Sequence, residues 1–538
     1  MKELRFILLL IPVIIFGQSP KLVVGVVVDQ MCYDYLYRFQ HHFSTDGFNR
    51  FLNRGVNCRN TNYNYVPTYT GPGHASIYTG TTPYNHGIVA NEWYDRTKAK
   101  GVNCVFDPSV QAVGNSSSAY GQVSPHHLET MTVTDQLKFT YPASNVYSIS
   151  IKDRSAVLPG GHLSDGSYWF DYSSGKFITS TFYTKELPPW VQEFNQTHNA
   201  DTYLADWELL HEPSSYSRSI DNSPYEVTIK GAKTPTFPYA FTSFAKGDYS
   251  QFTITPFANT LLTDLALELI QQERLGKNEA TDMLCVSYST PDIAGHAFGP
   301  YSLEVEDIYV RLDLELAKLF NALDKQVGKN NYVIFLTADH AVVPVPQQLK
   351  DEKLPGGYFD MSACLMSVNT QLQKKYGTIL IQSEENQNIY LNYALIDSLK
   401  IRKSEVQQEV ANILRSFPEV KVAVTGSDLE RGNIQDPWMQ MILNGYSKER
   451  SGDVIFMLKP GYLAISSDKG SEHKGTSHGS AFNYDTHVPL LWYGNKMKHQ
   501  EIFRPIEITD ISATLVHLLD LQRNGSMTGK PIIEILGH

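Results

Sequence analysis

A threonine before a glycine-rich turn is one residue in this sequence that could do covalent chemistry. Residues 66–76 read Val-Pro-Thr-Tyr-Thr-Gly-Pro-Gly-His-Ala-Ser, an apolar approach that breaks at a Pro/Gly turn before a helix expected from about Ala75. Thr70 would lie at the mouth of that helix, where unpaired backbone N–H groups and the helix dipole favour negative charge. A threonine in this setting usually serves the turn itself, so a role as nucleophile requires help from other segments.

Six side chains of types that bind zinc are spread over distant parts of the chain. Asp292 and His296 are four residues apart, so one helical turn would place both on the same side. Asp339 and His340 are adjacent at the end of an apolar run. Zinc prefers histidine nitrogen and carboxylate oxygen, and catalytic sites keep one position open. The set suffices for two ions and consists of Asp29, Asp292, His296, Asp339, His340 and His478.

Each of these residues also has an ordinary structural interpretation. Asp29 alone would serve as a helix cap, Asp339 and His340 as a surface turn, and Asp292 and His296 as an exposed polar pair. A metal site is favoured because most of these residues directly follow apolar runs that are predicted to be strands. The carboxyl ends of such strands meet at one edge of a sheet, where ligands bind.

Alternation of apolar runs and amphipathic helices predicts an α/β fold. We expect a three-layer α/β/α sandwich with a mostly parallel central sheet, because runs rich in β-branched residues are typical of strands buried on both faces. Helices are predicted around 261–269 and 312–323 and from Thr509. The predicted strands are 21–28, 145–151, 282–288, 332–337 and 488–493.

Two segments are predicted to interrupt this fold. Residues from about 162 to 250 are rich in Ser, Tyr and Pro and are interpreted as an irregular cap over the sheet. Residues from about 350 to 466 have their own helix and strand patterns and are interpreted as a small inserted α/β subdomain. The catalytic domain would then cover 18–538.

Residues 1–17 have the features of a secretory signal peptide. Lys2 and Arg5 precede an apolar run from Phe6 to Phe16, and Gly17 offers a cleavage point. The run is shorter than the about 20 residues of a membrane-spanning helix. We therefore predict a mature chain that is soluble, periplasmic or secreted, and free of membrane contact after cleavage.

Charge and cysteine content narrow the range of partners. The chain of 538 residues has a formal net charge of −11 without a basic patch, which argues against binding to nucleic acid or to an anionic membrane. The five cysteines are odd in number and lack the spacing of zinc ligands. A single disulfide bond such as Cys58–Cys104 is possible, but the sequence does not set the pairing. We expect small-molecule ligands and a monomer.

Taken in order, the motifs resemble the alkaline phosphatase superfamily and, within it, the PafA-type, phosphate-irrepressible bacterial alkaline phosphatases. The resemblance spans nearly the whole mature chain. The segments that carry it are VVVDQM (26–31), YTGPGHASIYTG (69–80), HGIVANEWYD (86–95), SIKDR (150–154), DIAGHAFGP (292–300), LTADH (336–340), HGS (478–480) and YDTHVPLL (484–491).

The resemblance implies a fold like that of alkaline phosphatase and two zinc ions with defined ligands. One ion would be held by Asp292, His296 and His478. The other would be held by Asp29, Asp339, His340 and the Thr70 oxygen. His478 is preferred over His473 and His487 because a glycine follows it, and His487 is interpreted as a residue beside the ligands.

Three further residues would bind the non-bridging oxygens of a phosphate group. Asn91 offers an amide N–H, and Lys152 and Arg154 offer two cations, one of them a fork that matches phosphate. In strand alternation, Lys152 and Arg154 point the same way, towards one ligand. A cationic pair favours the dianion of a monoester.

The implied reaction is hydrolysis of phosphate monoesters. Coordination to zinc lowers the pKa of the Thr70 hydroxyl, which attacks phosphorus to give a phosphothreonine that water then hydrolyses. A phosphodiesterase or nucleotide pyrophosphatase of the same superfamily uses the same metals and threonine, and differs in the residues around the phosphate. From another class, an exported protein that binds metal or phosphate without catalysis is the alternative. A sulfatase would need a C/S-x-P-x-R motif, which the sequence lacks.

Overall fold

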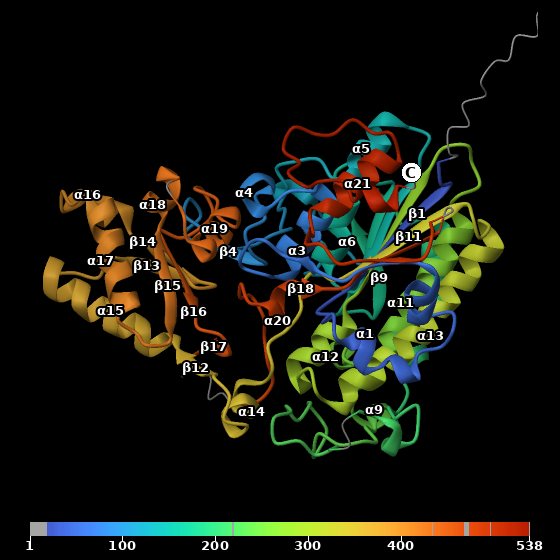
Figure 1. Ribbon diagram of the computed structural model, residues 1–538, viewed down its shortest axis with the longest axis horizontal. Helices are drawn as coiled ribbons and strands as arrows, with labels where there is room; N and C mark the ends of the chain where they lie inside the picture. The colour runs from blue at the N-terminus through green and yellow to red at the C-terminus, as the bar shows by residue number, and fades with distance from the viewer. Residues whose placement is uncertain (1–18, 218–219, 433, 467–472, 495–496, 537–538) are drawn as a thin grey trace, which may run out of the picture.

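The computed structural model describes residues 19–536 except 218–219, 433, 467–472 and 495–496 (Figure 1). The predicted signal peptide, 1–17, therefore lies outside the described residues. Among the residues that are described, no helix combines the length and apolar character needed to cross a membrane. All five cysteines are free, so the disulfide bond considered between Cys58 and Cys104 does not form.

A ten-stranded sheet forms the centre of the molecule, in the order β20-β2-β19-β11-β1-β10-β7-β8-β9-β6. Five strands in its middle run parallel, each beside the next. Their residues are buried, as expected for apolar strands covered on both faces. The five are β11 (Tyr332–Thr337), β1 (Leu22–Val28), β10 (Asp282–Tyr288), β7 (Val146–Ser150) and β8 (Gly166–Asp171).

Helices cover both faces of this sheet, which confirms the predicted three-layer, mostly parallel architecture (Figure 1). One side carries α11 (Phe257–Gln272), α12 (Thr290–Phe298) and α13 (Leu303–Gln326). The other side carries α3 (Thr70–Thr79), α5 (Val133–Thr140), α6 (Asp153–Gly160) and α21 (Asp510–Leu518).

Helix α3 begins at Thr70, five residues before the predicted start at Ala75. Pro72 does not prevent this, because the first turn of a helix has backbone N–H groups without an intrahelical partner, so a proline there loses nothing. Gly73 is required inside the helix, since a Cβ at this position would collide with the backbone of Asp339. The helix therefore packs its first turn directly against the candidate metal ligands.

The sheet edge next to β11 differs from the prediction. The strand expected over 488–493 is divided at Pro489, whose missing N–H cannot continue a ladder. After it, β19 (Leu490–Gly494) runs antiparallel to β11 and to β2 (Val56–Cys58), which in turn pairs with β20 (Gln500–Ile502). Before it, β18 (His487–Val488) joins a small separate sheet with β3 (Thr61–Asn62) and β21 (Ile506–Glu507).

The segment predicted as an irregular cap, 162–250, is partly regular. Its first part forms β8 and β9 (Lys176–Ser180), which extend the main sheet towards β6 (Ala112–Val113). These strands carry many polar and aromatic residues, so the sequence pattern hid them. From Thr181 onwards the segment contains short helices and loops, among them α7 (Pro189–Thr197) and α9 (Phe241–Phe244).

Residues 357–465, here called the inserted subdomain, form a separate lobe at one side of the molecule (Figure 1). A four-stranded sheet packs against α15 (Met361–Tyr376) and α17 (Lys403–Arg415) around its own apolar core. The lobe lies within the range in which an insertion was predicted. The lobe contains the four-stranded sheet and a separate strand pair. Its strands are β12 (Gly357–Asp360), β13 (Ile381–Glu385), β14 (Asn388–Leu391), β15 (Val420–Thr425), β16 (Val454–Leu458) and β17 (Tyr462–Ile465).

Candidate active site

The candidate ligands converge at the carboxyl ends of the central parallel strands. Asp29 directly follows β1, and Asp339 and His340 follow β11. Asp292 lies in the first turn of α12, shortly after β10. All four side chains are buried.

Asp29, Asp339 and His340 form the first group, with ligand atoms that all lie within 4.8 Å of one another. His340 Nε2 is 3.4 Å from Asp29 Oδ1 and 3.7 Å from Asp339 Oδ2. These two carboxylate oxygens are buried and accept no hydrogen bond. The hydroxyl of Thr70 is next to the group, with Oγ1 3.5 Å from His340 Nε2. Buried carboxylate oxygens without a donor are costly, so a cation fits between them.

Asp292, His340 and His478 form the second group, again with ligand atoms within 4.8 Å of one another. His296 joins it, because α12 places its Nε2 atom 3.2 Å from Asp292 Oδ1. His478 Nε2 is 3.6 Å from the same oxygen. The structure therefore brings all six predicted ligands and Thr70 to one place.

The three histidines present the correct nitrogen to a metal. A carbonyl oxygen can only accept a hydrogen bond, so each Nδ1 atom that contacts one carries the proton. Nε2 is then left with its lone pair, the arrangement that is typical of metal-binding histidines. The Nδ1 atoms of His296, His340 and His478 lie 2.8, 3.0 and 2.7 Å from the carbonyl oxygens of Thr476, Ala341 and Thr68.

Negative charge dominates the site. Lys152 Nζ lies 2.7 Å from Asp29 Oδ2 and 2.5 Å from Asp292 Oδ2, so one ammonium group bridges the two candidate groups. Burial and the nearby carboxylates of Asp292 and Asp339 hold the pKa of Asp29 well above its usual value. Three carboxyl groups are buried here, and bound divalent cations would favour the ionised form of each.

Asn91 is oriented by the first turn of α3. Its side-chain carbonyl accepts a hydrogen bond from the Gly71 N–H at 2.7 Å, which turns the amide Nδ2 group away from the helix. A Cβ at residue 71 would press on Asn91 Oδ1 at 3.2 Å and on Cys104 Sγ at 3.0 Å. The glycine therefore allows Asn91 to stand beside the nucleophile candidate with an N–H group to donate.

Lys152 and Arg154 approach the site differently from the prediction. Strand β7 ends at Ser150, Lys152 is the residue before α6, and Arg154 lies in the first turn of that helix. The argument from strand alternation is therefore wrong. Arg154 Nε is nevertheless buried without a hydrogen-bond partner. Its guanidinium lies 3.8 Å from the Asp153 carboxylate.

The two other histidines that were weighed against His478 lie elsewhere. His487 Nε2 is 3.0 Å from the Arg59 carbonyl oxygen, and its ring stacks on Tyr33. His487 was expected to lie beside the ligands, but β18 holds it in the small separate sheet instead. The ring of His473 lies 4.4 Å from the ring of Tyr358.

Sequence reasoning missed two residues that support the ligands. Gln30 donates from Nε2 to Asp292 Oδ1 at 2.7 Å and from its backbone N to Asp339 Oδ1 at 3.2 Å, with a left-handed φ of 66°. His74 donates from Nδ1 to the Thr70 carbonyl oxygen at 2.9 Å and accepts from Ser287 Oγ at 2.8 Å. Their only sequence signal is position, since Gln30 follows Asp29 and His74 is four residues after Thr70.

Comparison with known proteins gives concordant results. Residues 23–481 match the protein family described as type I phosphodiesterase / nucleotide pyrophosphatase. Alkaline phosphatase PafA of Elizabethkingia meningoseptica is 42% identical over 529 residues, covering 96% of this chain and 95% of the relative. Alkaline phosphatase PhoV of Synechococcus elongatus is 40% identical over 529 residues, covering 96% and 93%. A crystal structure of wild-type PafA superposes with a TM-score of 0.92 at 40% identity, covering 96% of this chain and 99% of that one.

Proposed function

The chain belongs to the type I phosphodiesterase / nucleotide pyrophosphatase family, and we propose that it is a zinc-dependent alkaline phosphatase. It would hydrolyse phosphate monoesters through a phosphothreonine. The chain resembles PafA-type alkaline phosphatases over nearly its full length. One observation carries the proposal. Six ligand side chains from four distant segments meet beside the hydroxyl of Thr70.

The donor set fits zinc. It consists only of imidazole nitrogen and carboxylate oxygen, and each group leaves room for a further ligand. When bound, two zinc ions would lower the pKa of the Thr70 hydroxyl and compensate the negative charge of the phosphate group. One ion would be held by Asp29, Asp339 and His340 with Thr70, and the other by Asp292, His296 and His478.

Thr70 acts as the nucleophile in the proposed reaction. Its Oγ1 atom would release its proton to solvent and form a bond to phosphorus while the bond between phosphorus and the ester oxygen breaks, and the departing alkoxide would take a proton from water on the side of His296 and His478. The first turn of α3 supports the attack, because its backbone N–H groups and dipole favour the negative charge of the phosphoryl group. Water then cleaves the phosphothreonine and restores the hydroxyl.

Selection of monoesters rests on the chain's own donors. Asn91 presents an N–H group, Lys152 Nζ bridges Asp29 and Asp292, and Arg154 supplies a second cation with a buried Nε that has no hydrogen-bond partner. A monoester dianion has three non-bridging oxygens to bind them, whereas a diester has two and a second bulky group. The arrangement therefore favours monoesters over diesters.

The test compares p-nitrophenyl phosphate with bis(p-nitrophenyl) phosphate on the full mature chain reconstituted with zinc. We expect two zinc ions per chain by mass spectrometry and a higher kcat/KM for the monoester. A higher kcat/KM for the diester would assign the protein to the phosphodiesterases of its family. Zinc binding without turnover of either compound would identify a non-catalytic binding protein.

Export is proposed from residues 1–17, whose charged start and apolar run are typical of a signal peptide. Expression of the full sequence in a Gram-negative host should place the activity in the periplasmic or extracellular fraction. N-terminal sequencing of that fraction should begin at or near Gln18. Activity retained in the cytoplasm with an intact N-terminus would contradict export.

A further inference from the structure

Asn91 begins a hairpin that contacts the inserted subdomain. It directly precedes β4 (Glu92–Asp95), which pairs antiparallel with β5 (Lys100–Asn103). The backbone carbonyl oxygen of Asn91 accepts a hydrogen bond from the Cys104 N–H at 2.9 Å, which closes the base of the hairpin. The place of the Asn91 side chain in the candidate site therefore depends on how this hairpin is held.

Arg450 of the inserted subdomain reaches the core beside this hairpin. Its Nη1 atom donates to the carbonyl oxygens of Gly87 and His127 at 2.6 and 2.7 Å. Its Nη2 atom lies 2.6 Å from Glu129 Oε1, and its Cζ atom lies 5.1 Å from the ring centroid of Trp93 in β4. One side chain of the subdomain thus contacts the chain before and after the asparagine.

A second arginine reaches in the opposite direction, from the hairpin to the subdomain. Arg96 lies in the turn between β4 and β5, with Nη2 2.7 Å from Asp453 Oδ2, and its guanidinium group also contacts the rings of Tyr390 and Tyr393. Asp453 is buried and accepts further hydrogen bonds from the Leu391 N–H at 2.7 Å and the Tyr393 hydroxyl at 2.5 Å. A buried carboxylate with all these donors is rigid, so it holds the hairpin in one position.

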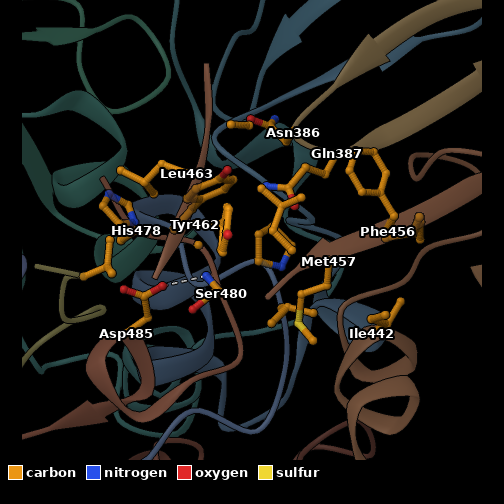
Figure 2. A pocket seen from close by; sticks show the side chains of 18 of the residues that line it. Asn386, Gln387, Ile442, Phe456, Met457, Tyr462, Leu463, His478, Ser480 and Asp485 are labelled. Carbon is orange, nitrogen blue, oxygen red and sulfur yellow. Dashed lines mark hydrogen bonds between the residues drawn. The ribbon is translucent and has the colours of Figure 1, made fainter. Parts of the chain in front are cut away.

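A cavity of about 50 Å³ lies between the subdomain and a different part of the core (Figure 2). Figure 2 shows Met457 of the subdomain on one side of it and His478 of the core on the other. Asn386, which also lines the cavity, donates from Nδ2 to the carbonyl oxygen of Glu92 at 2.8 Å. The subdomain therefore contacts the hairpin of Asn91 directly, whereas a cavity lies between it and His478.

We propose that Arg450 and Arg96 are positioning residues for Asn91, and that the inserted subdomain through them holds the amide that binds phosphate. Their contacts lie on both sides of Asn91 in the chain. The Asn91 side chain is itself fixed at Oδ1 by the Gly71 N–H, so a shift of the hairpin would move its Nδ2 group relative to Thr70. The subdomain would act through geometry, without touching the substrate. This inference rests on the proposed phosphomonoesterase function.

A double-mutant cycle tests whether the two arginines act through Asn91. The readout is the Kd of inorganic phosphate, measured by calorimetry on the zinc-loaded full mature chain. Arg96→Met combined with Arg450→Met should weaken phosphate binding by roughly tenfold, the loss of one hydrogen bond to a charged group. In an Asn91→Ala background the same two substitutions should have no further effect, because the amide that they position is absent. An unchanged Kd in the first variant, or the same loss in both backgrounds, would overturn the proposal.

Single variants keep the test independent of how well the double variant folds. Arg96→Met alone repeats the cycle with an arginine that is partly exposed. Arg96→Lys keeps a positive charge beside Asp453 and should bind phosphate more tightly than Arg96→Met. Equal weakening by the two substitutions would contradict a role for this ion pair.

Arg415→Met is the matched control. Arg415 donates to the Ala423 carbonyl oxygen inside the subdomain, so its loss disturbs the subdomain without removing a contact to the hairpin. The control should bind phosphate like the wild type. Weakening as large as that in Arg96→Met would mean that any disturbance of the subdomain suffices, which would overturn the specific role of the two arginines.

The outcomes separate this inference from the proposed function. If the wild type hydrolyses p-nitrophenyl phosphate but the cycle shows no coupling to Asn91, the positioning role is refuted and the phosphatase function stands. If the zinc-loaded wild type binds inorganic phosphate with the expected coupling but hydrolyses no monoester, the phosphatase function is refuted and the positioning role holds for a phosphate-binding site. A wild type that does not bind phosphate would refute both.

Discussion

The imidazole rings of His340 and His478 stack on each other, with centroids 3.5 Å apart and planes 14° from parallel. Burial lowers the pKa of both rings below the usual value, so both are neutral, which is the form that binds a metal. His340 also belongs to both groups of ligand atoms. The stacking therefore makes the two groups neighbours.

Replacing Thr70 tests the proposed nucleophile. Thr70→Ala should lower the turnover of p-nitrophenyl phosphate by at least roughly a thousandfold, equivalent to about 4 kcal/mol, because no other hydroxyl takes its place. Zinc content should stay near that of the wild type, since the protein side chains other than Thr70 hold the ions. Thr70→Ser, which keeps a hydroxyl, serves as the control. Wild-type turnover in Thr70→Ala would eliminate this residue as the nucleophile.

Removing two cations tests the selection of monoesters. Lys152→Ala combined with Arg154→Ala should lower kcat/KM for the monoester by roughly a hundredfold more than for the diester, because the dianion loses two charge-assisted contacts. Lys375→Ala is the control, since Lys375 pairs with Glu409 on the exposed surface of the inserted subdomain. Equal losses on both substrates would refute selection by charge.

Removing one ligand tests the assignment of the two metal groups. Asp29→Ala should reduce the bound zinc from two ions to about one per chain and abolish turnover, because its group loses one of three protein ligands. Asp34→Ala, a change to an exposed carboxylate directly before the next helix, should bind zinc like the wild type. Chelation of the wild type should stop turnover, and added zinc should restore it. Two tightly bound ions in Asp29→Ala would contradict the assignment.

The buried His86 predicts a loss of stability in acid. Burial lowers the pKa of His86 to about 3 in the folded chain, whereas the unfolded value is about 6.5. The unfolded state therefore binds the proton first, so stability is present above pH 6.5 and falls as the pH drops towards the folded pKa. Between pH 7 and pH 5 this group should remove about 2 kcal/mol from the free energy of unfolding.

Urea titrations of the wild type and of His86→Gln at both pH values would measure this contribution. Glutamine keeps a polar contact with Ser76 Oγ, the partner of His86 Nε2, but does not titrate. The variant should lose less stability on acidification than the wild type. The same loss in both proteins would show that His86 does not contribute to the pH dependence.

The central strands and several ligands could be predicted from local patterns alone. A strand buried on both faces must be apolar throughout, so β1, β10 and β11 appear in the sequence as uninterrupted runs. Asp29 and Asp339 are then located by the ends of those runs. The spacing of Asp292 and His296 predicted one helical turn, and α12 has that geometry. The strands and the helical turn could be predicted because each depends on neighbours within a few residues, whereas the role of these side chains as metal ligands stays a prediction.

Other features were decided by the tertiary structure. Strands β8 and β9 were missed because pairing of β8 with β7 and of β9 with β8, rather than their own composition, makes them strands. The position of Lys152 between Asp29 and Asp292 could not be derived, since it depends on how three strands are ordered in the sheet.

The sequence by itself thus determined the strand pattern and the chemical types of the candidate ligands. Only the tertiary structure decided which histidines meet and how Gln30 supports the candidate ligands. The physical reason is that a residue's type is local, whereas its partners come from segments brought together by packing of the whole chain.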